Sequence, residues 1–257
     1  MFIIKSIFPI RISAISYLNS LPFAWCLEHS AIIGEIGLSY DIPSQCADKL
    51  LAGKADIGLV PIVETLRMPE YYIISDLCIG ACDAVRTVVL ASETPLNDIS
   101  TIYLDRHSRT SVVLARILAK HFWKIKPEWV HYLGDITAYP RTGNSAAVVI
   151  GDKAFGVQLP YIYDLAVEWR KFSGLPFVFA CWVANKPIDD GFVSRFNGAL
   201  NGLFNNMDTI VEYYKDRTPA GVDLRDYWTN NISYPLTQDK REGLSLFLQY
   251  AGEMVPQ

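Results

Sequence analysis

Polar side chains that could bind an anion stand where short apolar runs give way to helical patterns. The first set is the run SYLNSLP, in which Ser16, Tyr17 and Asn19 directly follow an apolar strand pattern. Open α/β sheets bind ligands at the carboxyl ends of their strands, so this position suits a binding site. Asn19 or Ser20 could instead serve only as the N-cap of the next helix. Both roles can hold together, because a helix N-terminus also attracts anions.

A second set of donors, Ser108, Arg109, Thr110 and Ser111, opens a strongly periodic helical pattern. The unpaired N–H groups of a first helical turn, the helix dipole and the hydroxyl donors all favour a carboxylate or a phosphate. A cap needs only one hydroxyl, whereas this run supplies three. We therefore predict an anion site here, with ordinary helix capping as the alternative.

A third set follows the apolar run that ends at Ile150. Gly151 and Asp152 come at this strand end, before a helical turn. Asp152 is either the N-cap of that turn or a side chain that faces a ligand cleft. Arg86 could also meet an anion, and an ion pair with the nearby Asp83 is its alternative.

Several common chemistries lack their sequence motifs. The chain has no GxSxG elbow, no phosphate-binding glycine loop and no GxGxxG fingerprint, which removes the usual support for hydrolase triads and bound nucleotides. Its five cysteines are odd in number and scattered, which does not suit a disulfide framework. Neither the cysteines nor the histidines show metal-ligand spacing, so we expect no metal.

The charge balance and the hydropathy pattern limit the partners. Lys and Arg number 23 against 27 Asp and Glu, a net charge of −4, and no basic run is long enough to track nucleic acid. No apolar window reaches the roughly 18 residues that span a bilayer. The apolar segment from Met1 to Ile10 is short and is broken by Lys5 and Pro9, which makes it a poor signal peptide. We expect a cytoplasmic protein whose partner is a small anion.

Short β-branched runs alternate with amphipathic stretches, which predicts an α/β fold with parallel strands. Ser44 is the predicted N-cap of a helix from Gln45 to Ala52, and Pro61 is placed in the first turn of a helix. A continuous β pattern is expected from Tyr72 to Ala91. The other expected strands are 11–15, 36–42, 56–60, 101–104, 146–150, 176–183 and one around Val130; the other expected helices are 20–28, one from Ser108, 164–172, and several after Asp189.

The order of these elements predicts two α/β lobes with a ligand cleft between them. One lobe is expected to combine residues 1–85 with 181–257, and the other to hold residues 86–180. Strand-like crossings near residues 83–91 and 176–184 would join the lobes and act as a hinge.

Several blocks of the sequence resemble those of a known protein family. The blocks SYLNSLP, DIPSQCADKLLAGKADIGLVPIVE, DLCIGA with VRTVVL, the D-x-x-S-x-T-S helix start, VVIGD and PYIYDLAVEWRKFSGLPFVFACW run in order from Arg11 to Trp182. Together they resemble chorismate dehydratases of the futalosine route to menaquinone. The resemblance implies a fold like that of type II periplasmic binding proteins. The C-terminal helices match only in character, and the turn Cys82-Asp83-Ala84 stands where the family commonly has serines and a Gly-Pro turn.

The resemblance also implies an activity: removal of water from chorismate to give 3-[(1-carboxyvinyl)oxy]benzoate, without a metal or organic cofactor. Loss of a ring proton and of hydroxide needs a base, donors for the leaving oxygen and exclusion of water. We expect the enolpyruvyl carboxylate of the substrate to be the base, held by Asn19, with Asp152 as the protein alternative. The expected substrate-binding residues are Ser16, Tyr17, Ser44, Arg86, Ser108, Thr110, Ser111 and Gly151.

Two other functions stay open. A 1,4-dihydroxy-6-naphthoate synthase of the same pathway would share the fold, although its opening motif differs from SYLNSLP. A non-enzymatic binding protein for a small carboxylate would also share it, although export would require a signal peptide. The oligomeric state has no signal in the sequence.

Overall fold

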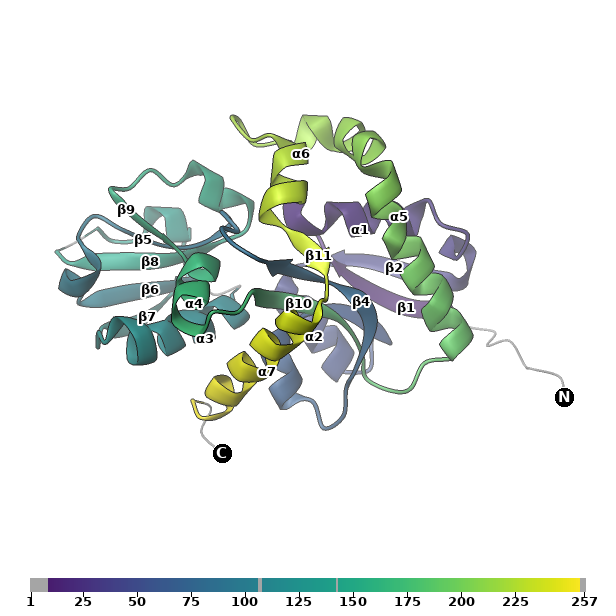
Figure 1. The fold of residues 1–257 in the computed structure, drawn as a ribbon, viewed down its shortest axis with the longest axis horizontal. Coiled ribbons are helices and arrows are strands. Elements are labelled where there is room, and N and C mark those ends of the chain that lie inside the picture. The colour runs from purple at the N-terminus through teal and green to yellow at the C-terminus, as the bar shows by residue number, and fades with distance from the viewer. Residues whose placement is uncertain (1–8, 106–107, 142, 255–257) are drawn as a thin grey trace, which may run out of the picture.

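The computed structural model describes residues 9–105, 108–141 and 143–254. Residues 1–8, on which the signal-peptide expectation rests, lie outside this part of the chain. Two β-sheets stand side by side, each with its own helices (Figure 1). We call the six-stranded sheet with its helices lobe 1 and the five-stranded sheet with its helices lobe 2. The predicted two-lobed α/β fold is confirmed.

The sheet of lobe 1 has the strand order β11-β4-β10-β3-β1-β2. β1 pairs in parallel with both β2 and β3, whereas β10 runs antiparallel to β3 and β4. The strands are β1 Ile10–Ile15, β2 Ile36–Asp41, β3 Ile57–Pro61, β4 Tyr72–Ala81, β10 Phe177–Ala184 and β11 Ser233–Pro235. Because β1, β2 and β3 are parallel, their carboxyl ends meet at one edge of the sheet.

Helices cover both faces of this sheet (Figure 1). Successive side chains of a strand point to opposite faces of the sheet. In β10, Phe177 points to one face and packs on Phe247 of α7, whereas Trp182 points to the other face and packs on Phe196 of α5. The strand is therefore buried on both sides, and its run FVFACWVA is wholly apolar. The helices of lobe 1 are α1 Leu21–Glu28, α2 Pro43–Leu51, α5 Asp190–Tyr214, α6 Leu224–Asp226 and α7 Gln238–Gly252.

The sheet of lobe 2 has the order β7-β6-β8-β5-β9. β6 is parallel to β7 and β8, so the carboxyl ends of these strands again share one edge. The elements are β5 Val88–Ser92, β6 Thr101–Asp105, α3 Thr110–Ile117, β7 Glu128–Tyr132, β8 Ser145–Ile150, β9 Tyr161–Asp164 and α4 Leu165–Ser173. Asp164 caps α4 by accepting from two backbone N–H groups, and Gly174 ends it in the left-handed conformation.

The chain passes between the lobes at residues 82–87 and 174–176, and neither segment is a strand. The β pattern expected from Tyr72 to Ala91 is thus two strands in two different sheets. The break falls at Arg86, which has a φ of 63° and donates its backbone N–H to the Asp164 carboxylate at 2.7 Å. This turn of the chain redirects it from β4 into β5.

Two local expectations are wrong for reasons of backbone geometry. Ser44 is not an N-cap, because Pro43 already occupies the first turn of α2 and Ile42 is the capping residue. Pro61 does not open a helix but closes β3, and a 3₁₀ segment, Ile62–Arg67, follows it. The helix α2 thus begins two residues earlier than expected, and Pro61 lies one residue before the segment it was expected to open.

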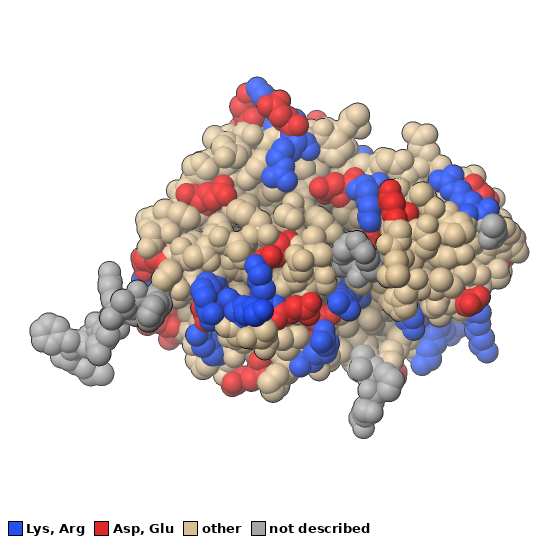
Figure 2. Space-filling model, turned by 180° about the vertical axis from the view of Figure 1, so that it is seen from behind, with Lys and Arg blue, Asp and Glu red and all other residues tan. Residues whose placement is uncertain are grey.

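Charged side chains of both signs are interspersed on the face shown in Figure 2. Ion pairs within the described residues include Lys49 with Asp41 at 2.6 Å and Arg195 with Glu35 at 2.8 Å. Within the described ranges, no helix has the length and apolar character needed to cross a membrane.

Candidate functional site

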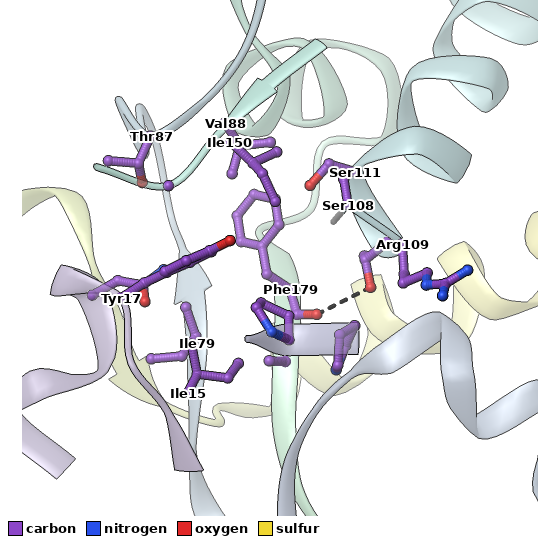
Figure 3. Close-up of a pocket in the computed structure, with 16 residues that line it drawn as sticks. Ile15, Tyr17, Ile79, Thr87, Val88, Ser108, Arg109, Ser111, Ile150 and Phe179 are labelled. Carbon is purple, nitrogen blue, oxygen red and sulfur yellow. Dashed lines mark hydrogen bonds between the residues drawn. The ribbon is translucent and has the colours of Figure 1, made fainter. Parts of the chain in front are cut away.

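A cleft of about 510 Å³, counting its open mouth, lies where the carboxyl ends of the strands of both lobes meet (Figure 3). Lobe 1 contributes the end of β1, the end of β3 and the middle of β10, and lobe 2 contributes the start of α3 and the end of β8. The lining residues are Ile15, Tyr17, Asn19, Pro43, Pro61, Ile79, Thr87, Val88, Ser108, Arg109, Thr110, Ser111, Ile150, Gly151, Phe179 and Ala180.

The structure brings six of the ten expected site residues together in this cleft: Tyr17, Asn19, Ser108, Thr110, Ser111 and Gly151. They come from three strand ends in two sheets. Because β6 and β8 are adjacent and parallel, the turn after each opens on the same side. The strand-end rule therefore located these residues from the sequence alone.

Three of the expected substrate-binding residues do not line the cleft. The hydroxyl of Ser16 donates to the carbonyl oxygen of Asp41 at 3.4 Å, and Ser44 is not among the lining residues although the adjacent Pro43 is. The Arg86 guanidinium lies 5.3 Å from the centre of the Phe155 ring and pairs with Asp226 at 3.8 Å, not with Asp83. Ser16 and Arg86 thus have partners away from the cleft, and Ser44 is a buried residue in the first turn of α2 that does not line it.

Asn19 presents an unsatisfied group. It lies within a single 3₁₀ turn, Leu18–Ser20, and makes no cap bond; Ser20 uses its own hydroxyl on the carbonyl oxygen of Ile15 at 2.7 Å. The Oδ1 atom of Asn19 is buried and, within the described part of the chain, has no hydrogen-bond partner. A buried polar atom without a partner costs stability. Because Asn19 lines the cleft, a ligand bound there could supply the missing hydrogen bond.

The start of α3 offers a second group of donors. The Oγ of Ser108 is buried with no partner among the described residues, and the Ser111 hydroxyl points into the cavity (Figure 3). Thr110 differs, since its hydroxyl donates to the Phe179 carbonyl oxygen at 3.2 Å and accepts from the Val63 N–H at 3.4 Å. Its one hydrogen is used, so the expected three-hydroxyl donor set reduces to Ser108 and Ser111.

Arg109 lines the cleft through its backbone side, while its guanidinium points away from the cavity (Figure 3). Its Nε lies 3.6 Å from the carboxylate of Glu64, a buried residue of lobe 1. This ion pair therefore joins the two lobes beside the cleft. The groups that face the cavity from this side are the neutral hydroxyls of Ser108 and Ser111 and the N-terminus of α3.

Tyr17 and Gly151 meet across the cleft. Gly151 has a φ of 72°, and a Cβ on it would lie 3.1 Å from the Tyr17 ring, so only glycine fits without a shift. Burial, with smaller contributions from Asp105 and Asp152, raises the pKa of Tyr17 to about 12. Tyr17 is thus a neutral phenol at physiological pH, and its hydroxyl reaches toward the middle of the cavity (Figure 3).

Asp152 is not an N-cap, and it does not line the cleft. Its Oδ1 instead accepts a hydrogen bond of 3.0 Å from the backbone N–H of Leu18 in lobe 1. Burial raises the pKa of this carboxyl, while the bond to Leu18 and the charge of Arg217 act in the opposite direction. The carboxylate is engaged beside the cleft and has no direct contact with the cavity.

Sequence reasoning missed the apolar walls. Ile15, Pro61 and Ile150 end strands β1, β3 and β8, so the strand-end rule could have found them. Phe179 had no such signal, because it lies inside an antiparallel strand whose residues are all apolar and buried. Together these side chains make a dry wall suited to a carbocyclic ring.

Comparisons with known proteins show which family and which folds this chain is similar to. A family model described as menaquinone biosynthesis matches residues 10–253. A chorismate dehydratase of Thermus thermophilus is 22% identical over 92% of this chain and 93% of its own length. A protein of Archaeoglobus fulgidus superposes with a TM-score of 0.73 at 14% identity, covering 96% of this chain and 97% of that chain. The periplasmic aliphatic sulphonate binding protein of Escherichia coli gives 0.61 at 16% identity, covering 97% and 89%. The fold is that of periplasmic binding proteins, as expected.

Proposed function

The chain belongs to the menaquinone biosynthesis family, and we propose that it is a chorismate dehydratase that forms 3-[(1-carboxyvinyl)oxy]benzoate. The observation that carries this proposal is the cleft itself: an apolar cavity with unsatisfied donors or acceptors at two places, Asn19 from lobe 1 and Ser108 from lobe 2. Chorismate has an apolar ring face, carboxylates that could accept from the Ser108 hydroxyl, and a ring hydroxyl that could donate to Asn19 Oδ1, so it fits this combination. The similarity to a chorismate dehydratase supports the same assignment.

The start of α3 is the proposed site for one carboxylate. Ser108, Ser111 and the N–H groups of the first helical turn would donate to it, and the helix dipole favours its charge. Because the protein carries a net charge of −4, these local donors must outweigh an unfavourable overall field. Arg109 contributes positive charge at the margin.

Asn19 is the proposed partner of the enolpyruvyl group. The carboxylate of that group removes the ring proton, the carbon–oxygen bond to the ring hydroxyl breaks, and the proton and hydroxide leave together as water while the ring becomes aromatic. The Asn19 amide N–H would donate to this carboxylate while Asn19 Oδ1 accepts from the ring hydroxyl, and the neutral Tyr17 phenol would donate to the leaving oxygen. Asp152 is the weaker candidate for the base, because its carboxylate binds Leu18 outside the cavity lining.

Incubation of the purified protein with chorismate, followed by chromatography of the products, tests the proposal directly. We expect an aromatic product lacking one water, formed equally well after dialysis against a chelator. The matched control is Asp98→Ala, which removes an exposed carboxylate on lobe 2 far from the lining residues. Failure of the unaltered protein to consume chorismate, or recovery of activity only on addition of a metal, would contradict the proposal.

A second candidate is favoured by the likeness to the sulphonate binding protein: a non-enzymatic receptor for a small carboxylate. The two candidates differ in one measurement. Calorimetric titration with chorismate, with product analysis of the same sample, gives binding with intact chorismate for a receptor and conversion for an enzyme.

A further inference from the structure

The peptide that carries Asn19 is held by three hydrogen bonds from distant segments. The Asp152 carboxylate accepts from Leu18 N–H at 3.0 Å, the Trp228 indole Nε1 donates to Leu18 O at 2.8 Å, and the Tyr234 hydroxyl donates to Asn19 O at 3.0 Å. The partners are 134, 210 and 215 residues away in sequence. A single 3₁₀ turn has little stability of its own, so these bonds set its geometry.

Two of the three bonds come from a rigid part of lobe 1. Trp228 and Tyr234 are almost fully buried, and Tyr234 packs edge-on against Phe23 at 5.0 Å. The strand β11 that carries Tyr234 is fixed by the buried Lys240, whose Nζ donates to the Ser233 hydroxyl and the Pro235 carbonyl, each at 2.7 Å. Both supports lie within lobe 1 and involve no residue of lobe 2.

The third bond crosses between the lobes. Asp152 directly follows Gly151, and Gly151 packs against the ring of Tyr17, which directly precedes Leu18. The pair Gly151-Asp152 of lobe 2 therefore docks on the pair Tyr17-Leu18 of lobe 1. The Asp152 carboxylate and the Leu18 N–H lie in segments that follow strands of different sheets, so any separation of the lobes would break this hydrogen bond.

We propose that Asp152 is a positioning residue that couples closure of the lobes to the alignment of Asn19. Closure brings the carboxylate onto Leu18 N–H, while Trp228 and Tyr234 hold the carbonyl oxygens of Leu18 and Asn19, so that only the Asn19 side chain is left for the substrate. This inference rests on the proposed function for its catalytic consequence. The docking itself stands on the geometry alone.

The kinetic test compares Asp152→Ala with Asp152→Asn. Asparagine keeps an oxygen that accepts from Leu18 N–H, whereas alanine does not. We expect Asp152→Ala to lower kcat by about 10- to 100-fold with little change in KM, because misalignment of a catalytic group costs rate and Asp152 does not touch the cavity. Asp152→Asn should recover most of kcat, and the control Asp98→Ala should match the unaltered protein.

A role for Asp152 as the base would make Asp152→Asn as inactive as Asp152→Ala, and that result would overturn the proposal. A large rise in KM with unchanged kcat in Asp152→Ala would overturn it as well. As a second probe of the same peptide, Tyr234→Phe removes one hydroxyl from a buried ring and should lower kcat several-fold at constant KM.

Amide hydrogen exchange of Leu18, measured without substrate, separates this inference from the proposed function. We expect Asp152→Ala to accelerate exchange of the Leu18 N–H at least tenfold and Asp98→Ala to leave it unchanged. If the unaltered protein fails to turn over chorismate, the proposed function falls, yet loss of Leu18 protection in Asp152→Ala would still support the docking. Unchanged Leu18 exchange in Asp152→Ala would overturn it.

Discussion

The two ends of the lobe 1 sheet treat their polar groups in opposite ways. At the amino ends of β1 and β3, Asp56 accepts from the backbone N–H, Nε and Nη2 of Arg11 at 2.9–3.0 Å and from Lys186 at 2.7 Å. At the carboxyl end of β1, by contrast, Asn19 Oδ1 has no partner within the described residues, and neither has Ser108 Oγ on the facing lobe. The Asp56 end of β1 and β3 is complete, whereas the cleft end of β1 is left open.

The difference separates stability from function. A folded protein is most stable when the polar groups at both ends of a sheet are hydrogen-bonded. A buried polar atom without a partner lowers the free energy of unfolding. Such atoms persist where a ligand supplies the missing bonds. The pKa values of two aspartates follow the same division: the Arg11 and Lys186 charges hold the pKa of Asp56 well below its usual range, whereas burial raises the pKa of Asp152 beside the cleft.

The largest effect is expected at the open end. Asn19→Ala should lower kcat for chorismate by about 10²- to 10³-fold, the typical loss for one preorganised donor, and leave the melting temperature unchanged because Asn19 caps no helix. Asn19→Asp should be similarly impaired, since it places a negative charge beside a dianionic substrate. Steady-state kinetics and thermal melts of both variants check this.

A normal kcat in Asn19→Asp would show that Asn19 is not at the reacting centre. A lowered melting temperature with kcat intact in Asn19→Ala would return Asn19 to a structural role. Either result would show that the unpartnered Asn19 side chain has no role in the reaction.

At the Asp56 end of the sheet, we expect a substitution to lower stability and to leave kcat unchanged. Asp56→Ala removes the shared partner of Arg11 and Lys186, and we expect a loss of about 2 kcal/mol in the free energy of unfolding, because both cations are half-exposed and regain water. For a chain of this size that corresponds to a drop in melting temperature of about 4–8 °C. The kcat for chorismate should be unchanged, and a fall in kcat at permissive temperature would contradict the division between the ends.

Local signals explain how far the sequence predicts this division. Each strand ending at the cleft is a short apolar run followed by polar residues, so Tyr17, Asn19, Ser111 and Gly151 could be located from one sequence. Long-range partners could not be located. Nothing in the sequence pairs Asp152 with Leu18 across 134 residues.

The crossing between the lobes shows the same limit. An apolar β pattern predicts a buried strand but not the sheet that it joins, so the run from Tyr72 to Ala91 predicts no position for the change from β4 to β5. The change of sheet depends on the left-handed backbone of Arg86 and its bond to Asp164, a contact between residues 78 positions apart.

Thr110 and Ser111, adjacent in the first turn of α3, allow the same contrast between stability and substrate binding to be tested. The Ser111 hydroxyl points into the cavity, and Ser111→Ala should weaken substrate binding about tenfold with little loss of stability. The Thr110 hydroxyl is bonded to lobe 1, so Thr110→Ala should cost about 1 kcal/mol of unfolding free energy and retain substrate affinity. Titration calorimetry and urea unfolding of the pair decide it; the opposite pattern would restore Thr110 as the anion donor.

The smallest effect is a difference in pH dependence between Asp56 and Asp152. The pKa of Asp56 is lowered in the folded protein, so its stabilising contribution is present above the unfolded-state pKa of about 4 and is lost as the pH falls through its folded-state pKa. The pKa of Asp152 is raised, so its ionised form is penalised at neutral pH, and the penalty is relieved as the pH falls toward about 4. Urea unfolding at pH 7, 6, 5 and 4 should therefore show the unaltered protein gaining stability relative to Asp152→Asn as the pH falls. Relative to Asp56→Asn it should show a constant advantage from pH 7 to about 5, which begins to decline toward pH 4. An advantage over Asp152→Asn that shrank on acidification would mean that the Leu18 N–H stabilises the ionised carboxylate more than burial penalises it, and both ends of the sheet would then hold their aspartates in the same way.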